Sequence, residues 1–211
     1  MMLQTQTYFL GPLQNNTYLV IDKPSGDSVI IDPAIGSQVI LEDLKKNKFT
    51  LKQIWITHAH FDHIGGVERL TRAFRPTIPV AMNSQDNTLW EEGGGVKDLG
   101  FELDLGPLPT QPLLNNQILK FGSSQFEVIF TPGHTPGHVI FYNANERLAF
   151  CGDLIFRHAI GIFDFKGGNY DQLVSSIKNH IFTLPDETRL LSGHGLETTV
   201  GEERRENPFF K

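Results

Sequence analysis

Short apolar runs alternate with turn signals along the first part of the chain. TYFL (7–10) ends at Gly11-Pro12, NTYLVID (16–22) ends at a Lys-Pro-Ser-Gly turn, and SVIID (28–32) ends at Pro33. Runs of this length bounded by glycine and proline indicate strands, and the turn at 23–26 indicates a hairpin. QIWIT (53–57) is a continuous apolar run. Such a run is typical of an inner strand covered on both faces.

Helical spacing appears in three other segments. Residues 37–48 place Val39, Ile40 and Leu44 at this spacing, and segments 64–74 and 169–182 carry the same pattern. Further strands are predicted at LKF (119–121), FEVIF (126–130), HVIFY (138–142), RLAFC (147–151) and RLLS (189–192), followed by a polar C-terminal segment. This order predicts an α+β fold in which two sheets pack together with helices outside.

The predicted elements run from end to end without a low-complexity linker, so we expect one domain over residues 1–211. A long excursion at 93–112, rich in glycine and proline, is the candidate for a lid over a site.

Composition narrows the possible functions. The formal net charge of the 211 residues is -6, which argues against the basic surface that a nucleic-acid binder needs. Cys151 is the single cysteine, so no intrachain disulfide forms and a reducing, cytoplasmic location is the simpler expectation. The N-terminus has no secretory pattern, and no apolar run of about 18 residues predicts a membrane span.

The strand at 53–57 leads into a cluster of metal-ligating residue types. Within IWITHAHFDHIGG (54–66) come His58, His60, Asp62 and His63. Imidazole nitrogen and carboxylate oxygen suit zinc and similar divalent ions. In an extended segment residues i and i+2 share a face, so His58 and His60 can reach one ion. Asp62 and His63 come where a helix begins and could serve a neighbouring ion.

More ligand types stand at other strand ends. His134 and His138 follow the strand FEVIF, Asp153 follows RLAFC, and His194 follows RLLS. A lone histidine at a strand end is most often a polar terminator, but several strand ends presenting such residues predict one shared metal site. Because His138 starts the next strand, we expect it to support the site rather than to bind a metal.

Two other residues near these motifs need an interpretation. Cys151 is expected to be a small buried apolar residue rather than a nucleophile. Asp32 either ends a strand as a turn residue or orients a ligating ring, and we favour the second role.

Taken together, the motifs resemble those of the metallo-β-lactamase fold superfamily. They are T-H-x-H-x-D-H at 57–63, G-H-T-P-G-H at 133–138, G-D at 152–153 and G-H-G at 193–195. The resemblance runs nearly the whole length of the chain and implies a four-layer αββα sandwich with metals at one edge. It also implies that His58, His60 and His134 hold one ion, that Asp62, His63 and His194 hold a second, and that Asp153 bridges them.

Within that superfamily the chain is most similar to the short bacterial form of the glyoxalase II group, the hydroxyacylglutathione hydrolases. The similar stretches are CGDLIFRHAIGIFDFKGGN and GLETTVGEERRENPF. The resemblance implies hydrolysis of a small thioester by a hydroxide bridging two divalent metal ions, with Asp62 helping to place the hydroxide. Zinc is the expected metal, and iron and manganese are alternatives. Ile162 stands where that group has a basic residue for a glutathione carboxylate, which argues against specificity for glutathione. Arg157 or Lys166 could replace that residue, but we favour the interpretation that both are solvated surface charges.

Other functions compete with this interpretation. Persulfide dioxygenases share the fold but use one iron, which His58, His134 and Asp153 would hold here. The complete second set of ligands favours two metals and hydrolysis. A lactonase is a further hydrolytic option, whereas a β-lactamase is disfavoured without an export signal and a nuclease by the acidic charge. A metal-binding module without turnover is disfavoured too. A structural zinc site is closed by four ligands, whereas seven candidate ligands around two ions would leave open positions.

Overall fold

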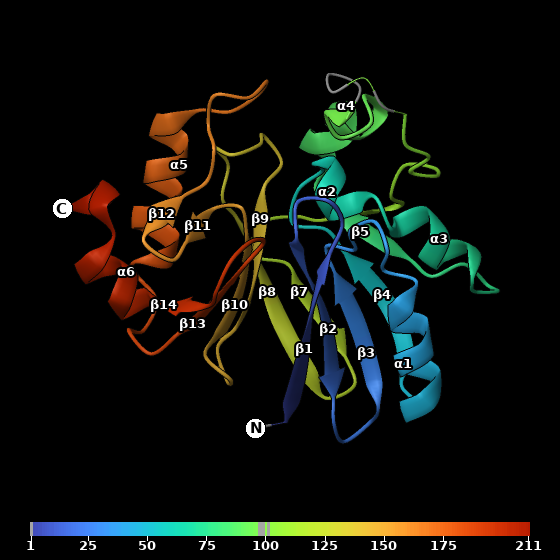
Figure 1. Ribbon diagram of the computed structural model, residues 1–211. Coiled ribbons are helices and arrows are strands. Elements are labelled where there is room, and N and C mark those ends of the chain that lie inside the picture. The colour runs from blue at the N-terminus through green and yellow to red at the C-terminus, as the bar shows by residue number, and fades with distance from the viewer. Residues whose placement is uncertain (1, 97–99, 101) are drawn as a thin grey trace.

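Two sheets pack face to face, and helices cover both outer faces, in the computed structural model of the protein (Figure 1). The structure describes residues 2–96, 100 and 102–211, and within these each of the two sheets has six strands. This arrangement confirms the predicted α+β fold with four αββα layers.

The first sheet is antiparallel at one side and parallel at the other. Its order is β1-β2-β3-β4-β5-β6, in which β1 to β3 pair antiparallel and β3 to β6 pair parallel. The strands are β1 (Leu3–Leu10), β2 (Asn15–Asp22), β3 (Asp27–Ile31), β4 (Thr50–Trp55), β5 (Val80–Met82) and β6 (Gln111–Pro112). The antiparallel pairing of β2 with β3 confirms the predicted hairpin.

The second sheet has the order β14-β13-β10-β9-β8-β7, and only β10 and β13 pair parallel in it. The strands are β7 (Ile118–Phe121), β8 (Ser124–Phe130), β9 (Val139–Asn143), β10 (Leu148–Gly152), β13 (Arg189–Ser192) and β14 (Thr198–Thr199). A small hairpin of β11 (Ile155–Phe156) and β12 (Ala159–Ile160) follows β10.

Helices form the two outer layers. The first sheet is covered by α1 (Val39–Asn47), α2 (Phe61–Ile64), α3 (Val67–Arg72), the 3₁₀ turn η1 (Ser84–Asp86) and α4 (Asn87–Glu91). The second is covered by α5 (Tyr170–Ser176), the π-helical turn η3 (Ile177–Ile181), α6 (Val200–Glu206) and the 3₁₀ turn η4 (Pro208–Phe210). No helix in the described ranges has the length and apolar content to cross a membrane.

The inner strands are apolar on both faces because each sheet lies between two cores. In β4, Trp55 points between the sheets, where its ring lies 5.3 Å from that of Phe126 and 5.1 Å from that of Phe141. Its neighbour Ile54 points to the opposite face and packs with the helices of the first sheet. Phe150 and Cys151 divide in the same way on β10. This period of two explains why QIWIT and RLAFC read as continuous apolar runs.

The structure corrects the predicted helix at 64–74. It consists of two short helices, α2 and α3, separated by Gly65 and Gly66. The amide of Gly66 donates to the carbonyl of Pro33 at 2.8 Å, so it leaves the helical hydrogen-bond pattern. A Cβ on Gly66 would lie 2.3 Å from the carbonyl oxygen of Ala34, so only glycine allows this close approach.

The structure defines two other segments more fully. The polar C-terminal segment forms α6, which begins after Thr199, whose side chain accepts a hydrogen bond from the amide of Glu202. The predicted helix at 169–182 is α5 continued by the π-helical turn η3.

The excursion at 93–112 lies partly outside the described residues, since 97–99 and 101 are not among them. In its described part, the carbonyl of Gly94 accepts a hydrogen bond from the amide of Phe61 at 2.9 Å. This end of the excursion therefore packs directly against the histidine-rich segment. The role of the whole excursion as a lid stays a prediction.

Candidate metal centre

All seven candidate ligands gather at one edge of the two sheets. His58 and His60 follow β4, Asp62 and His63 lie in α2, His134 follows β8, Asp153 follows β10 and His194 follows β13. The short helix α2 lies at the upper end of the strands in Figure 1, which is the edge where these chain segments meet. Residues far apart in sequence are thus brought together by the ends of strands from both sheets.

One half of the cluster consists of three imidazoles, those of His58, His60 and His134. Nε2 of His134 lies 2.9 Å from Nδ1 of His60 and 3.2 Å from Nε2 of His58. Three nitrogens bound tetrahedrally to one zinc ion at about 2.0–2.1 Å are separated by roughly 3.3 Å. The spacing of these donors fits a single divalent ion with only small adjustments.

The other half combines a carboxylate with two imidazoles, those of Asp62, His63 and His194. Oδ2 of Asp62 lies 3.0 Å from Nε2 of His194 and 3.5 Å from Nε2 of His63. The donor atoms of this trio lie within 4.8 Å of one another. This second group of nitrogen and oxygen donors fits a second divalent ion.

Asp153 lies between the two halves. Its Oδ2 is 3.7 Å from Nε2 of His134 in the first half and 3.6 Å from Nε2 of His194 in the second. Its Oδ1 is 3.3 Å from Nε2 of His63, yet this buried oxygen has no hydrogen-bond partner among the described residues. A buried carboxylate oxygen without a hydrogen bond is costly unless a cation binds it. The position and chemistry of Asp153 suit a bridging ligand.

Neighbouring groups orient three of the rings. Nδ1 of His63 donates to Oδ2 of Asp32 at 2.9 Å, and Nδ1 of His134 donates to the carbonyl of Ile162 at 2.6 Å. Nδ1 of His58 pairs with the hydroxyl of Thr57 at 3.0 Å. In each of these rings Nδ1 points away from the cluster and makes a hydrogen bond. This leaves Nε2 facing the cluster, where it can bind a metal. This is the role the sequence favoured for Asp32.

Burial keeps the first three imidazoles neutral. It lowers the pKa of His58 well below 6.5, that of His60 to about 3, and that of His134 as well. A neutral imidazole carries the free electron pair that a metal requires. The first half of the cluster is thus ready to bind a metal at neutral pH.

In the second half of the cluster, the carboxylates and imidazoles shift one another's pKa values. Burial alone would lower the pKa of His63, but Asp153, Asp62 and Asp32 together outweigh it and raise that pKa well above 6.5. For Asp153 burial acts to raise the pKa, and His63, His134 and His194 outweigh it, so the pKa of this carboxyl is lowered. The second half therefore holds ionised carboxylates that attract a cation, and a metal bound there would replace the proton on His63.

His138 lies behind the cluster rather than in it. Its ring is buried, and Nδ1 pairs with the hydroxyl of Thr131 at 2.9 Å. The ring centroid lies 5.2 Å from that of His58, and His138 belongs to neither trio of donors described above. Its packing supports His58 from the protein interior, in line with the expected supporting role.

Cys151 is fully buried on β10 and packs in the core of the second sheet. Burial raises the pKa of its thiol, so the thiolate form is strongly disfavoured. The predicted role as a small apolar residue is confirmed.

Two residues of the site escaped the sequence analysis. The buried Asp86 accepts hydrogen bonds from the amides of Ala59 and Gly137 at 3.0 and 2.6 Å, and so connects the two histidine loops. Nδ2 of the buried Asn15 lies 3.0 Å from Nε2 of His63. Neither residue belongs to a motif with ligand spacing. The only available signal was a polar residue beside a strand or turn, which is too common to identify a site.

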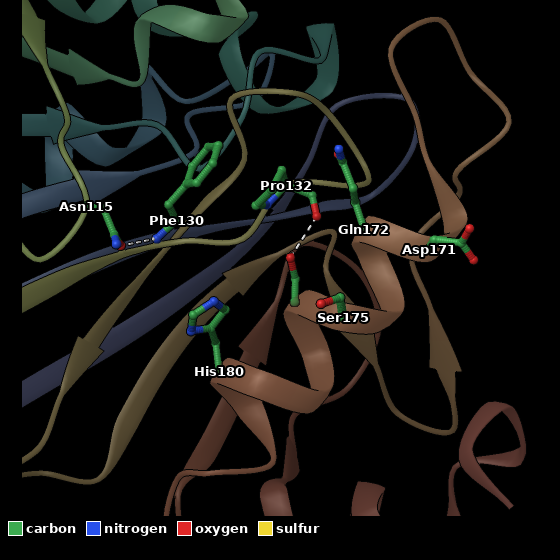
Figure 2. A pocket seen from close by; sticks show the side chains of 8 residues that line it. Asn115, Phe130, Pro132, Asp171, Gln172, Ser175 and His180 are labelled. Atoms are coloured by element: carbon green, nitrogen blue, oxygen red, sulfur yellow. Dashed lines mark hydrogen bonds between the residues drawn. The ribbon is translucent and has the colours of Figure 1, made fainter.

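A hollow of about 490 Å³ lies apart from this chemistry, beside α5 (Figure 2). It is lined by Asn115, Phe130, Pro132, Asp171, Gln172, Ser175, Ser176 and His180. None of the seven candidate ligands lines it, and its hydrogen bonds are structural, such as that from Ser176 to the carbonyl of Pro132 at 2.8 Å. The candidate chemistry thus belongs to the sheet edge, not to this hollow.

Known proteins are similar to this chain in sequence and in fold. Residues 10–194 match the family described as the metallo-beta-lactamase superfamily. "Probable metallo-hydrolase YqgX" of Bacillus subtilis is 34% identical over 210 residues, covering 95% of this chain and 94% of that protein. "Hydroxyacylglutathione hydrolase GloC" of Haemophilus influenzae is 34% identical over 172 residues, covering 81% of each.

Two solved structures are similar over almost their whole length. BLEG-1, described as a B3 metallo-beta-lactamase, has 35% sequence identity and a TM-score of 0.92, covering 99% of this chain and 100% of that one. TTHA1623 in a di-iron-bound form has 38% identity and a TM-score of 0.87, covering 97% of this chain and 99% of that one.

Proposed function

Because the chain belongs to the metallo-beta-lactamase superfamily, we propose that it is a dinuclear metallo-hydrolase that cleaves a thioester. The observation that carries this proposal is the position of Asp153 between two complete trios of donors. A mononuclear iron dioxygenase would need only His58, His134 and Asp153. The trio of Asp62, His63 and His194 would then have no role.

The residues of this chain suit two divalent ions. His58, His60 and His134 would hold one, Asp62, His63 and His194 the other, and Asp153 would contribute to both. When bound, such ions lower the pKa of water from about 15.7 towards about 7 and polarise a carbonyl oxygen. Zinc is the expected metal, while the di-iron form of TTHA1623 makes iron a strong alternative.

The protein side chains orient the reactants in this scheme. Oδ2 of Asp62 lies 3.0 Å from Nε2 of His194, and the carboxylate would accept a hydrogen bond from the attacking water and direct it. A thiol with a pKa near 8.5 departs as the thiolate, so no protonated side chain is needed at the leaving group. A site whose side chains serve as metal ligands rather than as proton donors to a leaving group therefore suits a thioester better than an ester of a poor leaving group.

The relative from Haemophilus influenzae supports this choice of bond. Its description as a hydroxyacylglutathione hydrolase names a thioester substrate, and 81% of this chain aligns with it. S-Lactoylglutathione is accordingly the reference substrate for a first assay.

The test joins metal content with turnover. Protein purified without added metal is analysed for zinc, iron and manganese, and hydrolysis of S-lactoylglutathione and simple acyl thioesters is then measured. About two ions per chain together with thioester hydrolysis would support the proposal. About one iron, with oxygen uptake in the presence of a persulfide, would replace it by the dioxygenase.

Variants separate catalysis from a structural metal. Asp153→Asn should remove turnover while the circular dichroism spectrum stays that of the folded protein. Turnover that persists in Asp153→Asn would contradict the role of this residue at both ions.

A β-lactam is a second candidate substrate, because BLEG-1 is similar over the whole chain and is described as a B3 metallo-beta-lactamase. A chromogenic cephalosporin assayed beside the thioesters decides between them. A higher kcat/KM for the cephalosporin would make lactam hydrolysis the principal activity.

A further inference from the structure

Apolar residues lie beside several of the candidate metal ligands. Four of them form what we call the apolar rim, namely Phe156, Ile162, Phe165 and Leu196. Ile162, Phe165 and Leu196 are 50%, 55% and 65% exposed. Phe156 is half-buried. A single exposed apolar residue is ordinary on a protein surface, but several around one candidate site indicate a ligand-binding surface.

Three of the rim residues contact a candidate ligand, and the fourth, Leu196, is close to one in sequence. The ring of Phe165 lies edge-on to that of His60, 5.9 Å between centroids, and the ring of Phe156 lies 6.2 Å from that of His194. Ile162 is held through its carbonyl, which accepts from Nδ1 of His134. Leu196 follows His194 by two residues. A substrate whose reacting carbonyl sits at the cluster would therefore touch the rim with its neighbouring groups.

The backbone beneath the rim is packed tightly against the site. A Cβ on Gly161 would lie 1.8 Å from the carbonyl oxygen of Asp153, so this glycine permits direct contact between the rim loop and the ligand loop. The amide of Gly161 donates to the carbonyl of Leu154 at 3.2 Å. Ile162 is consequently presented from a fixed position, as a specificity contact requires.

The two basic residues of the rim loop are already paired with carboxylates. Nε of Arg157 lies 3.2 Å from Oε1 of Glu202, and Nζ of Lys166 lies 2.5 Å from Oε1 of Glu92. An incoming peptide carboxylate would have to displace one of these partners and would gain little from the exchange. Exposed pairs of this kind also contribute only weakly to binding or stability. The rim loop thus offers apolar contact rather than a site for an anionic peptide.

We propose that the apolar rim selects a thioester with an apolar acyl group, carried on a thiol that needs no carboxylate for recognition. This inference rests on the proposed function and names the substrate class of the same site. The acyl chain would lie against Phe165 and Ile162, which contact the first trio of histidines. The thiol side would lie towards Phe156, whose ring contacts that of His194, and towards Leu196, which follows His194 by two residues.

The experiment compares three thioesters with the metal-loaded protein. They are hexanoyl and acetyl thioesters of N-acetylcysteamine, a neutral thiol, and S-lactoylglutathione, which has a polar acyl group and a peptide with carboxylates. We expect kcat/KM for the hexanoyl thioester to exceed both others by about tenfold or more, since each methylene group in an apolar site contributes strongly. A preference for S-lactoylglutathione would overturn the inference while leaving thioester hydrolysis intact.

Variants test the rim itself. Phe165→Ala should lower kcat/KM for the hexanoyl thioester about tenfold and change the acetyl thioester less than about twofold. Phe209→Ala, at a similarly exposed phenylalanine in η4, is the matched control and should change neither. Equal losses for both substrates in Phe165→Ala would contradict the assignment of the acyl chain to this residue.

A binding measurement separates the two levels of the proposal. Calorimetry with hexanoate, the product acid, should show tighter binding than lactate, and Phe165→Ala should remove that difference. Failure to hydrolyse any thioester would refute the proposed function, and the hexanoate titration would still decide whether the rim recognises apolar chains. Equal binding of hexanoate and lactate would refute the rim.

Discussion

The buried carboxylate of Asp86 accepts a hydrogen bond from the hydroxyl of Thr135 at 2.8 Å, directly beside the candidate ligand His134. The same carboxylate accepts the amide of Ala59, which stands between His58 and His60. One side chain thus holds the two loops that supply the first trio of imidazoles. Burial raises the pKa of Asp86, and the hydrogen bonds it accepts oppose that rise.

Asp86→Asn should weaken metal binding at the first trio. The amide group cannot accept hydrogen bonds at both of its ends, so one loop loses its partner and the donor spacing widens. Loss of an orienting group of this kind typically lowers metal affinity about 10–100-fold. Competition with a chromophoric chelator measures the change. Asp104→Asn, at an exposed carboxylate, is the control, and equal affinities in the two variants would contradict this role.

Asp32→Asn should act on the other half of the cluster. Asp32 accepts from Nδ1 of His63 and from the amide and hydroxyl of Thr57. Without the carboxylate, the ring of His63 is less firmly held and is a weaker donor to the second ion. We expect the metal content to fall from about two ions per chain towards one, with the second ion bound about 10–100-fold more weakly. Elemental analysis after dialysis checks this, and loss of the first ion instead would contradict it.

The sequence predicted the layers and the candidate ligands for a physical reason. Strand ends meet at sheet edges, and imidazole and carboxylate groups after several apolar runs therefore converge. It could not predict Asp86, because this residue acts on Ala59 and Thr135 across 27 and 49 residues of chain. Contacts of that range exist only after the sheets have paired.

The local sequence pattern did not predict elements that are very short, or helix ends that depend on tertiary contacts. β5 and β6 have three and two residues, too few for a periodic pattern. The division of α2 from α3 depends on the hydrogen bond from Gly66 to Pro33, which no local pattern encodes. For α6 the signal was present, since Thr199 and Glu202 have the spacing of a capping box, but the polar composition hid it.

Trp55→Ala should destabilise the fold more than most substitutions. The side chain is fully buried between the sheets and packs against Phe121, Phe126 and Phe141. Removing a buried tryptophan costs about 3–5 kcal/mol in the free energy of unfolding. Urea denaturation measures this value. Phe209→Ala, at a 47% exposed side chain, should change the free energy of unfolding by about 0.5 kcal/mol or less, and equal effects would show that the inter-sheet core is not the main source of stability.

Asp22 should make stability depend on pH at the opposite end of the sandwich from the metal cluster. It ends β2 in the first sheet and accepts hydrogen bonds from Ser123 and Ser124 at the β7–β8 turn of the second sheet, at 2.8 and 2.6 Å. Ser25 also donates to it, at 2.7 Å. Burial acts to raise the pKa of Asp22, but these hydroxyl donors outweigh it and lower the pKa from 3.8 to about 2.

Because the folded pKa is the lower one, the ionised carboxylate stabilises the fold above pH 3.8 and loses this contribution as the pH falls through about 2. The free energy of unfolding of the wild type should therefore exceed that of Asp22→Asn at pH 5, and the gap should narrow steadily between pH 4 and 2. Ser123→Ala removes one donor and should reduce, without abolishing, this dependence. Urea titrations at several pH values measure the gap. A gap that stays constant from pH 5 to 2 would show that the serine hydroxyls do not stabilise the charged form.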